Sequence, residues 1–252
     1  MAGTFRNRQS RVHFGECLSA ARRRQPVAGH PLLPETPLMA LRLHAITLAE
    51  VNHDDQAGIA TAEMAVAGPT SVVAFRDLCA VVSDQKAFSR DAPTAAQIEA
   101  HRVIVDRIFR RASVLPVPVG VVFRAPDVLT RWMELHYVSL TGALEFVDDR
   151  AVARVHIVRA DGKSDDLEAG SDLAAAAAES FRALRRRAVA TVPLRLEQVT
   201  GLVLSAAFLV ERDLWKEFLA GVAEQQDAHH LMRFDATGPW APYDFVRMQF
   251  EA

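Results

Sequence analysis

The sequence has few of the residues that mark extracellular, metal-binding or membrane proteins. Its only cysteines are Cys17 and Cys79, which form no CxxC pair, so neither a disulfide framework nor a cysteine-rich zinc site is expected. We expect two free thiols, as in a reducing cytoplasm, with one long-range disulfide as the alternative. No apolar run approaches the roughly 20 residues that cross a bilayer, so no membrane partner is expected.

An excess of charge is also missing. The 252 residues carry a net charge of −2, whereas nucleic-acid binding needs a strongly basic face. Four arginines gather within one predicted helix: Arg182, Arg185, Arg186 and Arg187. A solvated helix face explains them, and nucleic-acid binding with a steep salt dependence is the alternative. We therefore expect no nucleic-acid partner.

Motifs that bring catalytic groups together are absent from the sequence. There is no P-loop, no GxGxxG and no GxSxG. His229 and His230 are adjacent on a predicted strand, so they would face opposite sides and chelate one metal poorly. The acidic pairs lack EF-hand spacing and are read as solvated turns. We predict no catalytic residues, no cofactor and no metal, and a metal-dependent or hydrolytic enzyme on an α+β scaffold is the alternative.

Half of the residues are hydrophobic, which is enough to form a folded core. Residues 1–38 differ, because six arginines stand against two glutamates and no periodicity is present. We predict a disordered basic extension there, with a targeting segment or a basic arm for an acidic partner as alternatives. The rest divides into an N-terminal α+β domain at 39–148 and a C-terminal ferredoxin-like domain at 149–252.

The N-terminal domain shows alternating strands and periodic helices. Residues 41–48 alternate apolar and polar, which predicts a half-buried strand. Residues 71–75 and 78–83 predict a hairpin. Thr94 and Gln97 have capping-box spacing and begin a helix over 94–112. Residues 114–123 predict a strand whose prolines place it at an edge, and 127–146 predict a second helix. The apolar stripe expected on that helix consists of Leu129, Trp132, Met133, His136, Leu140, Ala143 and Leu144.

The C-terminal domain is predicted to follow the order β-α-β-β-α-β. The expected strands are 151–159, an edge strand near 192–197, a central strand at 202–210 and a short strand at 229–235. A loop at 161–170 precedes a helix capped by Ser171, and a second helix covers 214–222. This order is ferredoxin-like, and an added C-terminal strand at 243–250 completes the predicted α+β fold.

The most distinctive block follows at Thr237, Gly238, Pro239, Trp240, Ala241, Pro242 and Tyr243. The prolines stiffen the chain, and Trp240 and Tyr243 combine large apolar area with one polar group. Such residues anchor a segment, either to a partner or between the chain's own two domains. Clamping of the two domains is favoured for Trp240, without excluding a partner. The strand predicted after it could extend a sheet edge on a partner.

A second block is the β-rich run at 114–123, which contains Leu115, Pro116, Gly120, Val122 and Phe123. Together the two blocks resemble the signatures of the gas vesicle protein L/F family. Residues 80–83, His101, Gly142 and Glu145 also match that family's pattern. The chain departs from the pattern at Pro118 and Val119, where Arg and Phe are usual, and at Ala241, where proline is usual.

The resemblance implies a non-enzymatic accessory or minor structural protein of gas vesicle assembly. Its implied partners are the hydrophobic shell subunit and other accessory proteins, and its implied location is cytoplasmic and associated with the vesicle. The candidate partner-binding or domain-clamping residues are Leu115, Pro116, Gly120, Phe123, Thr237, Gly238, Pro239, Trp240, Pro242 and Tyr243.

Overall fold

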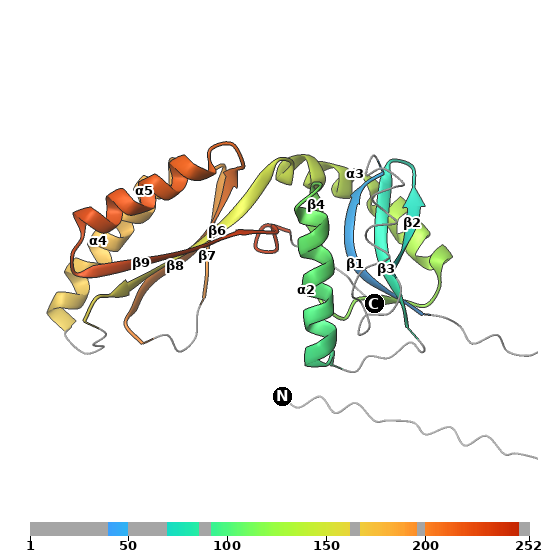
Figure 1. Cartoon of the computed structure of the whole chain (residues 1–252), viewed down its shortest axis with the longest axis horizontal. Helices are drawn as coiled ribbons and strands as arrows, with labels where there is room; N and C mark the ends of the chain where they lie inside the picture. Colours follow the sequence, from blue (N-terminus) through green and yellow to red (C-terminus); the bar gives the residue numbers. More distant parts are fainter. Residues whose placement is uncertain (1–39, 50–69, 86–91, 162–166, 196–199, 247–252) are drawn as a thin grey trace, which may run out of the picture. The chain divides into compact units, whose positions relative to one another are not determined.

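A computed structural model describes residues 40–49, 70–85, 92–161, 167–195 and 200–246 (Figure 1). The side chains of residues 167–171 are not among those described. Residues Pro37–Ala252 form one compact unit that contains two antiparallel sheets. The predicted basic extension at 1–38 lies outside the described residues.

The described part of the N-terminal half consists of a five-stranded sheet and two helices. The elements are β1 (Ala40–Leu48), β2 (Thr70–Phe75), β3 (Leu78–Gln85), α2 (Ala95–Phe109), β4 (Val114–Pro116), β5 (Val122–Phe123) and α3 (Pro126–Val147). The strand order is β2-β3-β1-β4, and β5 also pairs with β1. The hairpin between β2 and β3 is confirmed, with Arg76 at a positive φ of 55° in its turn.

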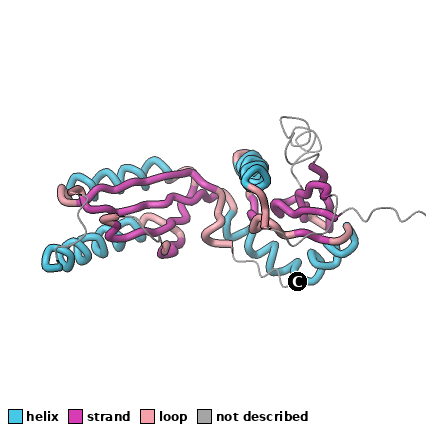
Figure 2. Tube along the Cα trace, turned by 90° about the horizontal axis from the view of Figure 1, so that it is seen from below, coloured by secondary structure: helices cyan, strands magenta, loops and turns pink. Residues whose placement is uncertain are grey.

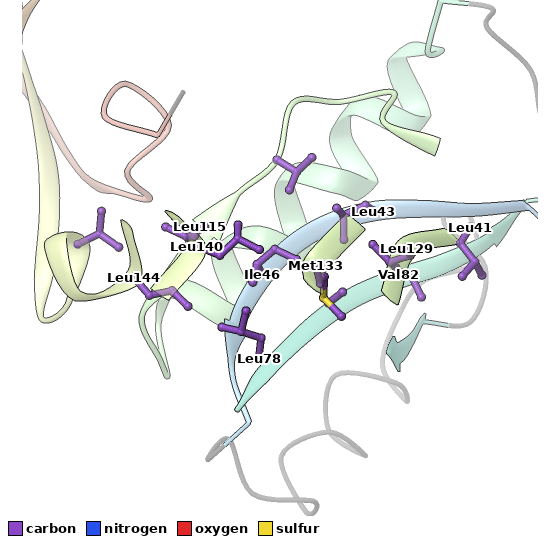
Figure 3. Packing of buried hydrophobic residues seen from close by; sticks show 13 residues of the cluster. Leu41, Leu43, Ile46, Leu78, Val82, Leu115, Leu129, Met133, Leu140 and Leu144 are labelled. Carbon is purple, nitrogen blue, oxygen red and sulfur yellow. The ribbon is translucent and has the colours of Figure 1, made fainter. Parts of the chain in front are cut away.

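Strand β1 is covered by helices on both faces. On one face Leu43 and Ile46 pack against Leu129 and Met133 of α3 (Figure 3). On the other face Ala45 packs in the cluster formed by the buried residues of α2. The prediction of a half-buried strand was therefore wrong, because its polar positions face a second helix instead of water.

A β-bulge in β1 explains how its polar residues reach the interior. Leu43 pairs with Val82 and Ala45 pairs with Val81, so His44 between them has no partner of its own in the register. A bulge of this kind redirects one side chain and breaks the alternation of faces. As a result, Leu43 and Ile46 share one face although they are three residues apart.

The single strand predicted over 114–123 is instead two short strands. The backbone between them turns through Gly120, which has a positive φ of 100°. The Val117 amide donates to the His44 carbonyl at 3.1 Å, and the Leu43 amide donates to the Val121 carbonyl at 3.0 Å. Pro118 has no amide to continue a ladder, which accounts for the break. The predicted edge position is confirmed for β4.

The C-terminal sheet has the ferredoxin-like strand arrangement. Its elements are β6 (Arg150–Arg159), α4 (Leu167–Arg185), β7 (Ala190–Pro193), β8 (Leu202–Glu211), α5 (Trp215–Ala228) and β9 (Met232–Trp240). The order β7-β8-β6-β9 is antiparallel throughout. This confirms the α+β class, and Figure 2 shows the helices of this part running along the strands.

One face of the C-terminal sheet holds its main core. Phe208 of β8 stacks with Phe218 of α5 at 5.3 Å and with Phe181 of α4 at 5.7 Å between ring centroids. On the opposite face Val152, Ala207 and Leu209 form a smaller cluster. Both helices therefore belong to the same face, as the ferredoxin-like order requires.

Two boundaries in this half differ from the prediction. Helix α4 begins at Leu167, so Ser171 lies inside it and does not cap it. Strand β9 runs on through the Thr237–Trp240 block, and residues 241–246 then form turns. The first part of the strand predicted at 243–250 is thus a turn, in which the Val246 amide donates to Pro242 at 3.2 Å. Residues 247–250 lie outside the described part.

Candidate partner-binding surface

The signature block at the end of β9 is fixed to the neighbouring strand at Gly238. Its φ is +133°, and a Cβ built there would lie 2.6 Å from the Val152 carbonyl oxygen and 2.8 Å from the Trp215 ring. Both the backbone conformation and the space therefore require glycine at this position. The Gly238–Pro239 peptide is cis.

Trp240 presents its ring to solvent at this point. Its residue is 41% exposed, and its Nε1 donates to Thr237 Oγ1 at 3.2 Å. Thr237 and Pro239 are exposed as well. The indole N–H is thus hydrogen-bonded within the block itself, which leaves the exposed part of the ring available for an apolar contact with another surface.

The segment 241–246 that follows Trp240 contacts the cores of both sheets. Ala241 is buried and, with Tyr243, belongs to the cluster formed by α2. Phe245 packs against the Val152 cluster of the C-terminal sheet, and Val246 packs against the core beneath α3. Segment 241–246 is therefore the part of the tail that joins the two sheets.

An ion pair holds segment 241–246 in place. Arg154 of β6 donates two hydrogen bonds to the carboxylate of Asp244, at 2.9 and 3.2 Å. Asp244 is well buried at its side chain and Arg154 only partly so. A two-point contact of this kind fixes direction as well as distance.

A groove of about 620 Å³ lies between this segment and α3. One wall consists of Asp244, Phe245 and Val246, together with Val192 of β7. The other wall is one side of α3, with Trp132, His136, Ser139, Leu140, Ala143 and Phe146. The groove thus combines aromatic and aliphatic side chains with a few polar ones, as sites for peptide or helix side chains do.

The second signature block supports this groove from inside. Leu115 and Pro116 are buried in the core beneath α3, and Gly120 forms the turn. Phe123 contacts Trp132, with ring centroids 5.7 Å apart, and Trp132 lines the groove. Segment 241–246 and the 115–123 block therefore approach the same helix. Pro242 is buried, whereas Trp240 does not line the groove.

A buried histidine pair lies on the opposite face of β1. The Nδ1 atoms of His44 and His101 are 3.0 Å apart, so one imidazole donates to the other. The second nitrogen of His44 lies 2.9 Å from Ser83 Oγ. The sequence interpretation did not identify this pair, because His44 appeared to lie on the polar face of a half-buried strand.

Burial keeps both imidazoles neutral. It lowers the pKa of His44 to about 3, with further lowering by His101 and Arg42. The pKa of His101 falls to about 4, also mainly through burial, although the Val117 carbonyl raises it. Tyr243 lies beside this pair, at 6.5 Å between its ring and that of His101, and burial raises its pKa to about 12.

Two structural facts about the described residues bear on catalysis. Within them, no cluster of three or more His, Cys, Asp or Glu side chains is placed to hold a metal ion. The histidine pair is enclosed, with both residues about 1% exposed, so it cannot reach a substrate. None of the described helices is both long and apolar enough to cross a membrane.

The described residues define an α+β protein with two antiparallel sheets, the second of them ferredoxin-like. An aromatic tail segment joins the two sheets. A model of the gas vesicle synthesis protein GvpL/GvpF family matches residues 43–175 and 162–247. The chain belongs to this family. It is also 28% identical over 207 residues to gas vesicle protein F2 of Halobacterium salinarum, covering 79% of this chain and 91% of that protein.

Solved structures share the fold. The gas vesicle protein GvpF from Anabaena sp. PCC7120 superposes with a TM-score of 0.68 at 14% identity, covering 85% of this chain and 98% of that one. GvpF from Microcystis aeruginosa gives a TM-score of 0.63 at 13% identity, covering 83% and 99%. The predicted family is confirmed, and the role of this protein is related to gas vesicles.

Proposed function

We propose that this protein is a non-enzymatic accessory or minor structural protein of gas vesicle assembly that binds the hydrophobic shell subunit or another accessory protein. It would act in the cytoplasm and associate with the vesicle. The observation that carries this proposal is the aromatic surface at the tail, where Trp240 of the family's terminal block is exposed and the residues directly after that block, Asp244 to Val246, form one wall of the groove. Family membership supplies the gas vesicle context.

A binding role suits these residues better than a catalytic one. The tail is anchored by Gly238 and by the Arg154–Asp244 pair, so its aromatic side chains are held in position before a partner arrives. Preorganised aromatic anchors lose little conformational entropy on binding. A very hydrophobic subunit needs such a contact, because its exposed surface would otherwise aggregate before it polymerises.

The test is co-expression of the full chain with the shell subunit from the same operon, followed by purification through a tag on this chain. We expect a soluble complex that contains both proteins. Trp240→Ala should reduce the recovered shell subunit, because it removes the exposed aromatic anchor. Leu231→Ala is the matched control, since Leu231 is 73% exposed and lies in the turn before β9, at the opposite end of that strand from Trp240.

If the shell subunit stays insoluble and absent from the purified fraction, direct shell binding is wrong. The same purification with each other accessory protein of the operon then tests the second half of the proposal. A complex that forms equally well with Trp240→Ala would place the contact elsewhere on the molecule.

A further inference from the structure

Helix α3 exposes an unusual number of large apolar side chains. Val138 is 81% exposed and Leu135 73%. Val128 and Phe146 are 47% and 40% exposed, and the Arg150 guanidinium lies over the Phe146 ring. They are four of the ten large hydrophobic residues that are exposed in the described part of the chain. A set of such residues on one element marks an interaction surface, whereas single exposed ones do not.

The four side chains form one stripe along the helix. Val128, Leu135 and Phe146 are spaced by close to two and three helical turns, so they lie in one line, and Val138 lies beside it. We call these four residues the α3 stripe. Small residues interrupt it at Ser139 and Gly142, and a Cβ built at Gly142 would meet no atom within 4 Å. A second helix can approach closely there.

Acidic residues follow one edge of the α3 stripe. Asp127, Glu134 and Glu145 each precede a stripe residue by one position, so they form a parallel line along the same helix, and all three are exposed. Arg131 is the one basic residue of α3 on this side. The other edge is the groove, with His136 and Ala143. The edge away from the groove is therefore net negative.

The size of this face selects the type of partner. Helix α3 has 22 residues and is about 33 Å long. With the width of one helix, about 10 Å, it offers about 300 Å², well below the roughly 800 Å² per partner of a stable dimer. An amphipathic helix lying along it matches this area.

We propose that the α3 stripe binds an amphipathic helix of another protein, one with an apolar ridge and with Lys or Arg along one flank. The ridge would cover Leu135, Val138 and Phe146 and approach closely at Gly142. The basic flank would lie along Asp127, Glu134 and Glu145. This inference deepens the proposed function, because it names the surface and the chemistry of the partner segment.

The test uses a synthetic helical peptide of about 20 residues, long enough to hold a helix, with Leu three and four positions apart and Lys on one flank. Its twin carries Glu in place of every Lys. Binding to the full-length protein is measured by fluorescence anisotropy at about 100 mM salt, where surface charges still act at short range. We expect the Lys peptide to bind about tenfold more tightly than the Glu twin.

Matched variants locate the site. Leu135→Glu should weaken the Lys peptide about tenfold, because it places a charge in the middle of the ridge. Leu231→Glu is the control, since Leu231 is also 73% exposed but lies in the turn before β9. Glu134→Lys with Glu145→Lys should reverse the preference between the two peptides. These positions are exposed, so an unchanged melting temperature shows that each variant is folded.

Several results would overturn the inference. Equal binding of the Lys peptide and the Glu peptide would contradict the charge selectivity. An equal loss of peptide affinity with Leu135→Glu and Leu231→Glu would contradict the location of the site. A concentration-dependent dimer that Leu135→Glu abolishes would make a second copy the occupant. Binding that appears only after deletion of residues 1–38 would make the chain's own basic segment the occupant. If the peptides fail while the shell subunit co-purifies, this inference is wrong and the proposed function stands.

Discussion

Each of the two sheets contains a histidine–serine contact between neighbouring strands, in different surroundings. In the N-terminal sheet His44 of β1 lies 2.9 Å from Ser83 of β3, and in the C-terminal sheet His156 of β6 lies 2.8 Å from Ser205 of β8. His44 is fully buried because α2 covers its face, whereas His156 remains half-buried. His44 makes the contact through Nε2 and His156 through Nδ1, and the helix over the first pair is what buries it.

The sheets also differ in how they are joined to the tail. The C-terminal sheet provides strand pairing to the Thr237–Trp240 block through β6, and the N-terminal sheet provides a packing surface on α2 for Tyr243. Arg212, just after β8, adds a further connection, because its Nη2 donates to the Phe109 carbonyl at 2.6 Å at the end of α2. The tail is therefore part of the structure of both sheets.

The largest effect should come from removing the close approach at Gly238. Gly238→Ala would force a Cβ against the Val152 carbonyl and the Trp215 ring and would strain the positive φ. We expect a loss of about 3 kcal/mol in the free energy of unfolding, from overpacking and backbone strain together. Urea unfolding followed by tryptophan fluorescence measures it.

Gly221→Ala is a useful comparison on α5. There the nearest atoms to a built Cβ belong to the flexible Arg187 side chain, which can move away at lower cost. A loss for Gly238→Ala no larger than for Gly221→Ala would show that the strand end relaxes and that the tail is not rigidly held.

The next effect is a dependence of stability on pH. The folded-state pKa values of about 3 for His44 and about 4 for His101 lie below the unfolded value of 6.5. The unfolded chain therefore takes up protons first as the pH falls below 6.5, and the folded state loses stability between about pH 6.5 and 4. At about pH 5 the loss should be about 2 kcal/mol per histidine, fully absent above pH 7.

His44→Asn should flatten this pH dependence, and His156→Asn should leave it unchanged. The measurement is the urea midpoint at several pH values for the three proteins. Arg42 and Tyr243 are the other ionisable groups beside the pair, and neither titrates in this window as an isolated side chain. An equal slope for His44→Asn and the unmodified protein would contradict the assignment to the buried pair.

A smaller effect is expected at the start of α2. Thr94 accepts from the Gln97 amide at 3.3 Å, and the Gln97 side chain accepts from the Thr94 amide at 2.9 Å, which completes a capping box. Thr94→Ala should cost about 1 kcal/mol, because an N-terminal amide of the helix loses its acceptor. Thermal unfolding by circular dichroism measures it.

Thr130→Ala serves as the control, since the Thr130 hydroxyl only donates to the Pro126 carbonyl within α3. Alanine favours a helix interior, so this change should be close to neutral. If both threonine variants lose the same stability, the capping contact has no special role.

Much of the fold could be predicted because its elements follow clear local rules. The hairpin around Arg76, the capping box at Thr94 and the β-α-β-β-α-β order are each written in neighbouring residues. The tail block and the 115–123 block were sufficient to predict the family. What local rules could not give was the bulge at His44, because a bulge becomes visible only through the register of a partner strand far along the chain.

The surface of α3 was missed for a different reason. The sequence interpretation chose the stripe that includes Leu129, Met133 and Leu140, which is the buried side. The helix is apolar on more than this side, since Leu135 and Val138 fall outside that stripe. A helix that is hydrophobic over most of its circumference either is buried all round or has a partner, and this signal was present in the sequence.

The smallest expected effect has the opposite sign and compares α3 with the tail. Gly142 lies in the helix interior with open space above it, unlike Gly238. Gly142→Ala should stabilise the protein by about 0.5 to 1 kcal/mol, because alanine is the better helix former and no atom is displaced. Thermal unfolding measures the gain, and binding of the Lys peptide measures the cost. Gly142 lowers the stability of the helix, and no neighbouring atom in the folded chain requires a glycine there. The close approach of a partner helix would explain why glycine occupies this position. If Gly142→Ala raises stability and leaves peptide binding within a factor of about two, the close approach at Gly142 is not part of the interface, and only the outer side chains of the α3 stripe make contact.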